Sequence, residues 1–325
     1  MADPKLHHFV PQFYLRGFAS ESDRVAVRHR TRSSHVTSVR NTAAQNGLYK
    51  VPNRPLTAEG TFGKVEAATS AAFEVLRAGT LPAAGTSERD ALCLFMGLQL
   101  NRTPDTLAVL RFVYEARAAL GPGFISDDAM RVYLTQLYGF KPEDPEVGAA
   151  ADFANASGSD TRTDTEVQEH QLELMFKMAL QTAPLLEARS WSLEAPKAEP
   201  LVTSDRPVVL WNAERPEDDF MGVGLAEAEE IWLIVDRRRM LVLRRQGPER
   251  IKRIGPERVT AVNRHIARHC AQQLIGHPDD AAALERLPLS RIRPVIRFWR
   301  APLEDSTATE DILHAWIPTR DIPEQ

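Results

Sequence analysis

The sequence predicts an α+β fold, with a mostly helical middle layer packed on a small antiparallel or mixed sheet formed by N-terminal and C-terminal segments. Apolar residues alternate with period two near both ends of the chain, at 24–39 and again beyond residue 190. Between these regions they recur at helical spacing. The 325 residues are 43% apolar and 26% charged, which is typical of a globular protein.

A short helix is predicted at Pro11–Phe18, because proline at the first helical position already has the backbone angle that a helix needs. Phe13, Tyr14 and Phe18 form its apolar side. Large aromatic side chains are costly to expose, so we expect these three to pack against the helix predicted at 87–102 or against the late strands.

A half-buried hairpin is predicted at 24–28 and 34–39, where apolar and polar residues alternate. The helical middle then comprises predicted helices at 63–78, 87–102, 103–120, 126–138 and 165–188, the last kinked or shortened by Pro184. Residues 141–164 are rich in proline, glycine, alanine, serine and aspartate and show no apolar period, so we expect a mobile loop there.

Period two returns in the last third of the chain. Strands are predicted at 191–193, 200–203, 208–211, 231–235 and 240–244, with a hairpin turn at 236–239. A helix at 256–274 and a final strand at 294–299 follow. We expect residues 301–325 to form a short acidic tail, and the whole chain, 1–325, to form a single domain.

Composition also indicates where the protein works. The chain has no apolar run near the roughly 20 residues of a membrane helix and no apolar signal core at its N-terminus. Cys93 and Cys270 lie in apolar or helical patterns, which favours buried thiols over disulfides. We therefore expect a cytoplasmic protein with no membrane partner; the oligomeric state is left open.

The net charge of −4 hides a strong segregation. Residues 1–50 carry eight Lys and Arg against three Asp and Glu, residues 51–235 fifteen against 29, and residues 236–300 sixteen against six. If the two basic blocks share a surface, they would attract phosphates or nucleic acid; alternatively, they neutralise the acidic middle of the same molecule. The arginines of the phosphate hypothesis are Arg16, Arg237, Arg238, Arg239, Arg244, Arg245, Arg291, Arg293 and Arg297.

Several familiar motifs are absent. Gly222-Val223-Gly224 lacks the strand, third glycine and acidic residue of a dinucleotide loop, and no phosphate-binding loop, serine-hydrolase elbow or Cys-x-x-Cys occurs. His265 and His269 stand four apart on a predicted helix, as zinc ligands do. They lack the accompanying glutamate and a third ligand, so we interpret them as structural.

Four separated motifs carry a family resemblance. They are His7-His8-Phe9-Val10-Pro11-Gln12-Phe13-Tyr14-Leu15-Arg16-Gly17-Phe18, Gln99-Leu100-Asn101-Arg102-Thr103-Pro104, Thr203-Ser204-Asp205-Arg206-Pro207 and Asn263. In this order they resemble the family catalogued as domain of unknown function 4238. The resemblance implies that the four elements converge on one site, which we expect to contain His8, Gln99, Arg102 and Asp205.

The two histidines project in different directions if the backbone is extended, so at most one of His7 and His8 is expected to be functional. An imidazole can act as general base, metal ligand or phosphate donor, or it can simply satisfy a backbone group. The string His7–Pro11 is also similar to the opening of ββα-metal nucleases of the His-Asn-His type. Those enzymes need a nearby asparagine followed by a second histidine in a compact ββα unit, but here His29 and His35 precede Asn41 and Asn46.

The remaining candidates have equally open interpretations. Arg102 and Gln99 share a helix face, where they could hold a carboxylate or phosphate, or complete the helix end. Asp205 follows a strand, as active-site carboxylates often do, but could equally form a turn. Arg206 belongs to the candidate binding set, and so does Asn263, although a bonded, buried amide is the expectation there.

Two functions therefore remain. The first is a phosphodiesterase or nuclease-like hydrolase in which His7 or His8 and Asp205 supply acid–base or metal chemistry, with a divalent metal ion, while Arg16 and Arg102 hold a phosphate. The second is a non-catalytic recognition protein that binds a nucleic-acid end, a small anion or a partner protein.

Overall fold

The computed structural model describes residues 6–30, 32–51, 58–108, 110–111, 126–138, 142–156, 163–215, 223–289, 292–302 and 309–320. Contacts divide the chain into two compact units. The first contains residues 1–106 and 172–291, and the second residues 107–171 and 292–325. The chain crosses between the units three times, and the expectation of a single domain stays a prediction.

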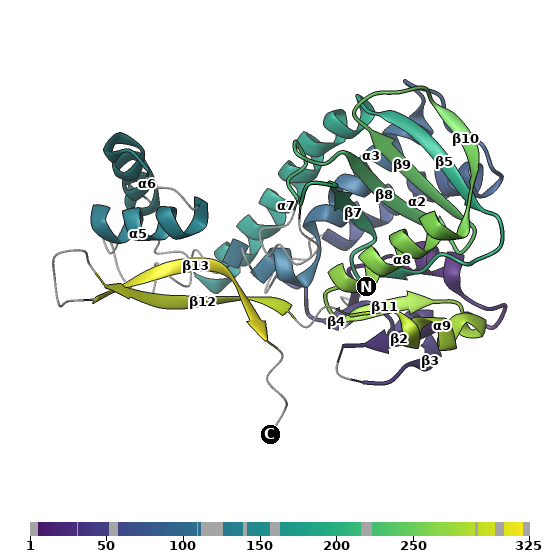
Figure 1. Ribbon diagram of the computed structural model, residues 1–325, viewed down its shortest axis with the longest axis horizontal. Coiled ribbons are helices and arrows are strands. Elements are labelled where there is room, and N and C mark those ends of the chain that lie inside the picture. Colours follow the sequence, from purple (N-terminus) through teal and green to yellow (C-terminus); the bar gives the residue numbers. More distant parts are fainter. Residues whose placement is uncertain are drawn as a thin grey trace. The chain divides into compact units, whose positions relative to one another are not determined.

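The first unit is organised around a five-stranded mixed sheet (Figure 1). Its strands lie in the order β10 (Arg250–Ile254), β5 (Ser190–Pro196), β9 (Arg239–Arg244), β8 (Glu230–Asp236) and β7 (Val208–Trp211). Only the pair β10–β5 is parallel; the other pairs are antiparallel. The predicted strands at 191–193, 208–211, 231–235 and 240–244 are confirmed, whereas β10 was not predicted.

Helices cover both faces of this sheet. On one face, α2 (Ala58–Arg77) contacts β8 and β9, and α3 (Ser87–Asn101) packs its Arg89 guanidinium over the Trp191 ring. On the other face, α8 (Pro256–His269) places Arg258 over Trp232 and against the carboxylates of Glu194 and Glu230. The first unit is therefore a sheet between helical layers (Figure 1).

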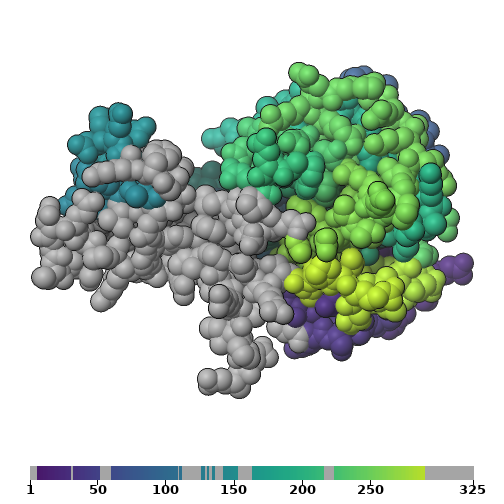
Figure 2. All heavy atoms as spheres, in the orientation of Figure 1, coloured from purple at the N-terminus to yellow at the C-terminus, as the bar shows by residue number. Residues whose placement is uncertain are grey.

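A second, antiparallel sheet joins N-terminal strands to strands from the last third of the chain. Its order is β3 (His35–Ser38), β2 (Arg24–His29), β11 (Gln273–Gly276) and β6 (Thr203–Ser204). Val27 pairs with Ile275, and the purple N-terminal atoms lie against the yellow-green late atoms in Figure 2. The α+β fold and the predicted hairpin of 24–28 with 34–39 are confirmed.

Aromatic packing fixes the N-terminal segment to the core. The helix α1 (Gln12–Leu15) continues into a 3₁₀ turn (Arg16–Phe18), and Tyr14 and Phe18 are fully buried. The Tyr14 ring lies 6.2 Å from that of Phe95 on α3, and its hydroxyl hydrogen-bonds with Thr203 Oγ1 at 2.6 Å. The predicted docking of this segment is therefore confirmed.

A close backbone approach explains the glycine in the signature. A Cβ at Gly17 would lie 2.8 Å from the Val235 carbonyl oxygen of β8. Such a contact is far shorter than carbon and oxygen tolerate, so any larger residue would push the turn away from the sheet.

The second unit corrects two predictions. Residues 141–164 were expected to form a mobile loop, but they contain helix α6 (Asp144–Ala156), which begins with an aspartate followed by proline and continues through alanines. Residues 301–325 were expected to form an acidic tail, but β13 (Thr309–Arg320) pairs with β12 (Ile292–Pro302). Helix α5 (Asp127–Tyr138) confirms the predicted helix at 126–138, and Arg131 links it to Asp144 of α6.

One predicted boundary was also wrong. The helix predicted at 256–274 ends at His269, because Cys270 is extended and the chain then enters β11. The helix predicted at 165–188 is confirmed as α7 (Asp164–Glu187), which contains Pro184 and is not shortened by it. No helix in the described part of the chain is both long and apolar enough to cross a membrane.

Candidate functional site

The signature histidines lie on β1 (Leu6–His8), which pairs with β4 (Ala44–Asn46). His7 is buried, and its Nδ1 accepts a hydrogen bond of 2.9 Å from the Tyr49 backbone N–H. The His7 and Tyr49 rings also stack, with 5.6 Å between their centroids. His7 thus holds the chain that leaves β4.

His8 uses the opposite side of the strand. Its Nε2 donates to the Arg40 carbonyl oxygen at 2.9 Å, and burial lowers the pKa of the imidazole. The His8 carbonyl oxygen accepts a hydrogen bond from Arg102 Nη2. The structure therefore brings two predicted site residues into direct contact, although it is the His8 backbone, and not its imidazole, that Arg102 touches.

Arg102 is buried immediately after α3 and has several partners. Its Nη1 lies 3.0 Å from Glu66 Oε1, and its guanidinium lies 4.1 Å from the centroid of the Phe62 ring. The Arg102 carbonyl oxygen accepts a hydrogen bond from the Tyr49 hydroxyl at 2.8 Å. These contacts connect α2, α3 and β1, while Arg102 Nε is buried without a hydrogen-bond partner.

Gln99 differs from its neighbours. It lies one turn before Arg102 and one turn after Phe95, so it shares their face of α3. The residue is 2% exposed, and neither its amide nitrogen nor its amide oxygen has a hydrogen-bond partner. A buried primary amide without hydrogen-bond partners is energetically unfavourable. Gln99 contributes no hydrogen bond to the network around it.

Asp205 organises the connection between α8 and β11. Its carboxylate accepts three backbone hydrogen bonds, from Ala271 at 2.8 Å, Gln272 at 2.6 Å and Gln273 at 3.0 Å. The side chain is buried, and this burial raises the pKa of the carboxyl. The Gln273 side chain continues the network by accepting from the Ala43 backbone N–H, next to the partner of His8 in β4.

The other predicted binding residues also have partners within the protein. Arg16 pairs with Asp23, and Arg206 with Asp105. Asn263 accepts from the Val202 N–H and donates to the Pro200 carbonyl, as expected for a bonded amide.

The basic set divides into several groups. Arg244 pairs with Glu194 and Glu230, and Arg245 donates to three backbone carbonyls. Arg291 and the side chains of Arg293 and Arg297 lie outside the described residues. The remaining members, Arg237, Arg238 and Arg239, lie together at a pocket.

The histidine pair on α8 is part of an aromatic stack. The His265 and His269 rings stack with centroids 4.1 Å apart, and His265 meets Trp232 edge to face. Burial lowers the pKa of His265 to about 3 and that of His269 to about 4, so both are neutral near pH 7. Within the described ranges, no group of three or more His, Cys, Asp or Glu side chains could hold a metal ion.

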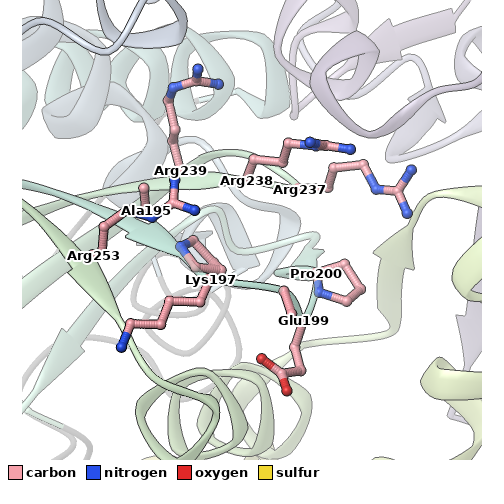
Figure 3. Close-up of a pocket in the computed structure, with 10 residues that line it drawn as sticks. Ala195, Lys197, Glu199, Pro200, Arg237, Arg238, Arg239 and Arg253 are labelled. Atoms are coloured by element: carbon pink, nitrogen blue, oxygen red, sulfur yellow. The ribbon is translucent and has the colours of Figure 1, made fainter.

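A pocket of about 250 Å³ lies where four strands of the five-stranded sheet begin or end (Figure 3). Strands β5 and β10 are parallel and end together, with Ala195 opposite Arg253. The turn between β8 and β9 reaches the same edge, because β9 runs antiparallel to β5. A hydrogen bond of 2.9 Å from the Leu201 N–H to the Arg237 carbonyl oxygen closes this edge.

The pocket is strongly basic. Its lining consists of Ala195, Pro196, Lys197, Ala198, Glu199, Pro200, Arg237, Arg238, Arg239 and Arg253. Two of the five cations are neutralised, since Arg237 pairs with Asp280 and Arg239 with Asp236. Among the described residues, none forms an ion pair with the other three cations, Lys197, Arg238 and Arg253, although the Glu199 carboxylate lines the same pocket.

Comparison with known proteins identifies a family. The family model described as "Protein of unknown function (DUF4238)" matches residues 6–280. The chain belongs to this family. No curated protein and no solved structure matches the chain.

The DUF4238 match covers both the signature residues and the pocket, since all lining residues fall between 195 and 253. Sequence reasoning named Arg237, Arg238 and Arg239 but missed Lys197, Glu199 and Arg253. Residues 250–254, Arg-Ile-Lys-Arg-Ile, do not alternate between apolar and polar residues, so no local pattern predicts β10. Its parallel pairing with β5, which assembles the pocket, has no local signal.

Proposed function

We propose that the protein is a recognition protein that binds a phosphate-bearing ligand in the basic pocket at the edge of the five-stranded sheet. The observation that carries this proposal is the set of three cations, Lys197, Arg238 and Arg253, which line one concave site and form no ion pair with any residue that the structure describes. Unpaired cations around a cavity create a positive potential that attracts anions, and guanidinium groups match phosphate oxygens in a forked geometry.

The backbone at this edge adds to the positive field. Helix α8 begins at Pro256, three residues after Arg253, and no side chain caps its N-terminus. The N-terminal end of a helix carries about half a positive charge, which favours a nearby anion. This contribution supplements the side-chain cations and does not replace them.

The hydrolase hypothesis receives less support. The imidazole of His8 and the carboxylate of Asp205 are bonded to backbone groups, and Arg102 to Glu66 and the His8 carbonyl. Hydrolysis remains an untested prediction, and assays of phosphodiester cleavage with Mg²⁺, Mn²⁺ and Zn²⁺ would test it. Nucleic-acid binding and a cytoplasmic location likewise stay predictions.

Calorimetric titration with inorganic phosphate and pyrophosphate at low ionic strength tests the proposal. We expect both anions to bind, and binding to weaken as salt is added because the contact is electrostatic. The substitutions Lys197→Gln, Arg238→Gln and Arg253→Gln should each weaken pyrophosphate binding by about three- to tenfold, since each removes one charged contact.

Arg250→Gln is the matched control. Arg250 lies on the same strand as Arg253 and is exposed, but it does not line the pocket. This variant removes the same net charge and should change the affinity by less than about twofold. The proposal fails if wild-type protein binds neither anion, or if Arg250→Gln weakens binding as much as Arg253→Gln does.

A further inference from the structure

The pocket has two chemically different sides. In Figure 3 the guanidinium groups of Arg237, Arg238 and Arg239 lie on one side of the view. The Lys197 ammonium and the Glu199 carboxylate lie on the opposite side. A ligand that fills the pocket would therefore meet arginines at one end and a mixed pair of charges at the other.

Glu199 does not fit a site for phosphate alone. Its carboxylate lines the pocket, is exposed, and has no hydrogen-bond donor among the residues that the structure describes. A carboxylate accepts hydrogen bonds and repels phosphate, so it would weaken the binding of a bare anion. It would strengthen the binding of a ligand that also offers hydroxyl donors.

The presence of both Glu199 and Lys197 in the lining favours hydroxyl groups further. The ammonium only donates hydrogen bonds and the carboxylate only accepts them, whereas a hydroxyl does both. Neighbouring hydroxyls on one carbon skeleton could therefore satisfy both side chains at once. Only Ala198 lies between these two residues in the sequence, and its side chain is a single methyl group.

The apolar part of the lining argues against a nucleobase. It consists of Ala195, Pro196, Ala198 and Pro200, with no aromatic side chain. Base recognition in proteins relies heavily on stacking with aromatic rings or on an apolar slot. The lining is thus suited to a polar, compact skeleton.

We infer that the ligand is a small phosphorylated polyol or sugar phosphate, with its phosphoryl group at the arginine side and its hydroxyls at Lys197 and Glu199. This inference rests on the proposed anion-binding function. It assigns Glu199 as the residue that distinguishes the ligand from inorganic phosphate.

Titrations of wild-type protein and Glu199→Gln with two probes, inorganic phosphate and glucose 6-phosphate, provide the test. Wild-type protein should bind glucose 6-phosphate about tenfold more tightly than phosphate, because the sugar hydroxyls add hydrogen bonds to charged side chains. Glu199→Gln should weaken the binding of glucose 6-phosphate several-fold and strengthen that of phosphate, because it removes a repulsive charge. This opposite response cannot arise from misfolding.

Glu21→Gln is the charge-matched control, since Glu21 is exposed and outside the pocket, and it should change neither affinity. Absence of binding by both probes would overturn the proposed function itself. Phosphate binding with no preference for the sugar phosphate, or with both affinities raised by Glu199→Gln, would overturn only the present inference. Tighter binding of adenosine monophosphate or O-phosphoserine than of glucose 6-phosphate would also overturn it.

Discussion

The signature network and the basic pocket use charged residues in opposite ways. In the network, His7, Arg102 and Asp205 are buried and His8 is partly buried, and each is bonded to backbone or to an opposite charge. In the pocket, Lys197, Arg238 and Arg253 are exposed and form no ion pair within the described part of the chain. A buried ion without a partner is costly, whereas an exposed one costs little and remains available.

On the proposed function, the family motifs build the fold and the binding site lies outside them. The signature elements are far apart in sequence, and the contacts of Arg102 and Asp205 join them to the rest of the fold. Such positions tolerate few substitutions for structural reasons alone. Variants that separate stability from ligand binding would test this division.

Deletion of residues 1–18 should have the largest effect. It removes Tyr14, Leu15 and Phe18, all fully buried, and so opens the core of the first unit. The loss of folding free energy should exceed the roughly 5–15 kcal/mol that stabilises a typical domain. We therefore expect an insoluble or molten product that shows no cooperative melting transition in calorimetry. Arg16→Ala, which removes only the exposed pair with Asp23, should unfold normally. An unchanged melting temperature after the deletion would refute the role of this segment.

Asp205→Ala should be the most damaging of the single substitutions. It leaves the N–H groups of Ala271, Gln272 and Gln273 without their acceptor, which we expect to lower the free energy of unfolding by about 4 kcal/mol. Arg238→Ala, in the pocket, should change it by less than about 0.5 kcal/mol. Urea denaturation of both variants measures the difference. Equal free energies of unfolding would contradict the claim that the network stabilises the fold and the pocket does not.

Acidification should destabilise the protein through the stacked histidines. The folded-state pKa values of about 3 for His265 and about 4 for His269 lie below the value of about 6.5 for an unfolded chain. As the pH falls through 6.5 towards 4, the unfolded chain binds more protons, so the free energy of unfolding decreases, by up to about 3 kcal/mol between pH 7 and pH 5. Urea denaturation at both pH values measures this loss, which should be smaller in His265→Phe. Equal stability of the wild type at the two pH values would contradict the prediction.

Gln99→Leu should have the smallest effect. The amide has no partner to lose, so an apolar residue of similar size should leave the free energy of unfolding within about 1 kcal/mol of wild type or raise it. Arg102→Met, one turn away, should cost about 3 kcal/mol because it leaves Glu66 unpaired in a half-buried site. If Gln99→Leu lowers the melting temperature strongly, the amide does have a hydrogen-bond partner.

Local patterns predicted most elements of the first unit, because its strands and helices have clear apolar periods. The failures occurred where the pattern was misleading. The stripe of Val259, Val262, Ile266 and Cys270 continues to Leu274, so the helix was extended across the start of β11. The polar composition of 141–164 concealed the alanine-rich helix α6.

The candidate site was harder to predict, for a physical reason. Arg102 contacts the His8 backbone, but a sequence does not show which atoms are already bonded, and a single functional site built from the predicted residues stays a prediction. The pocket requires the register of four strands, in which Arg253 lies opposite Ala195. Pairings between distant segments depend on the whole fold and leave no periodic trace in either segment.

The pairing of β2 with β11 also has a consequence for synthesis. Val27 and Ile275 are neighbours in the sheet, yet the ribosome makes them about 250 residues apart. At typical elongation rates of about 5–20 residues per second, β2 waits roughly 10 to 50 s for this partner. Until then, one edge of an apolar strand remains open to other chains, so newly made protein is most exposed to aggregation before residue 276 has emerged.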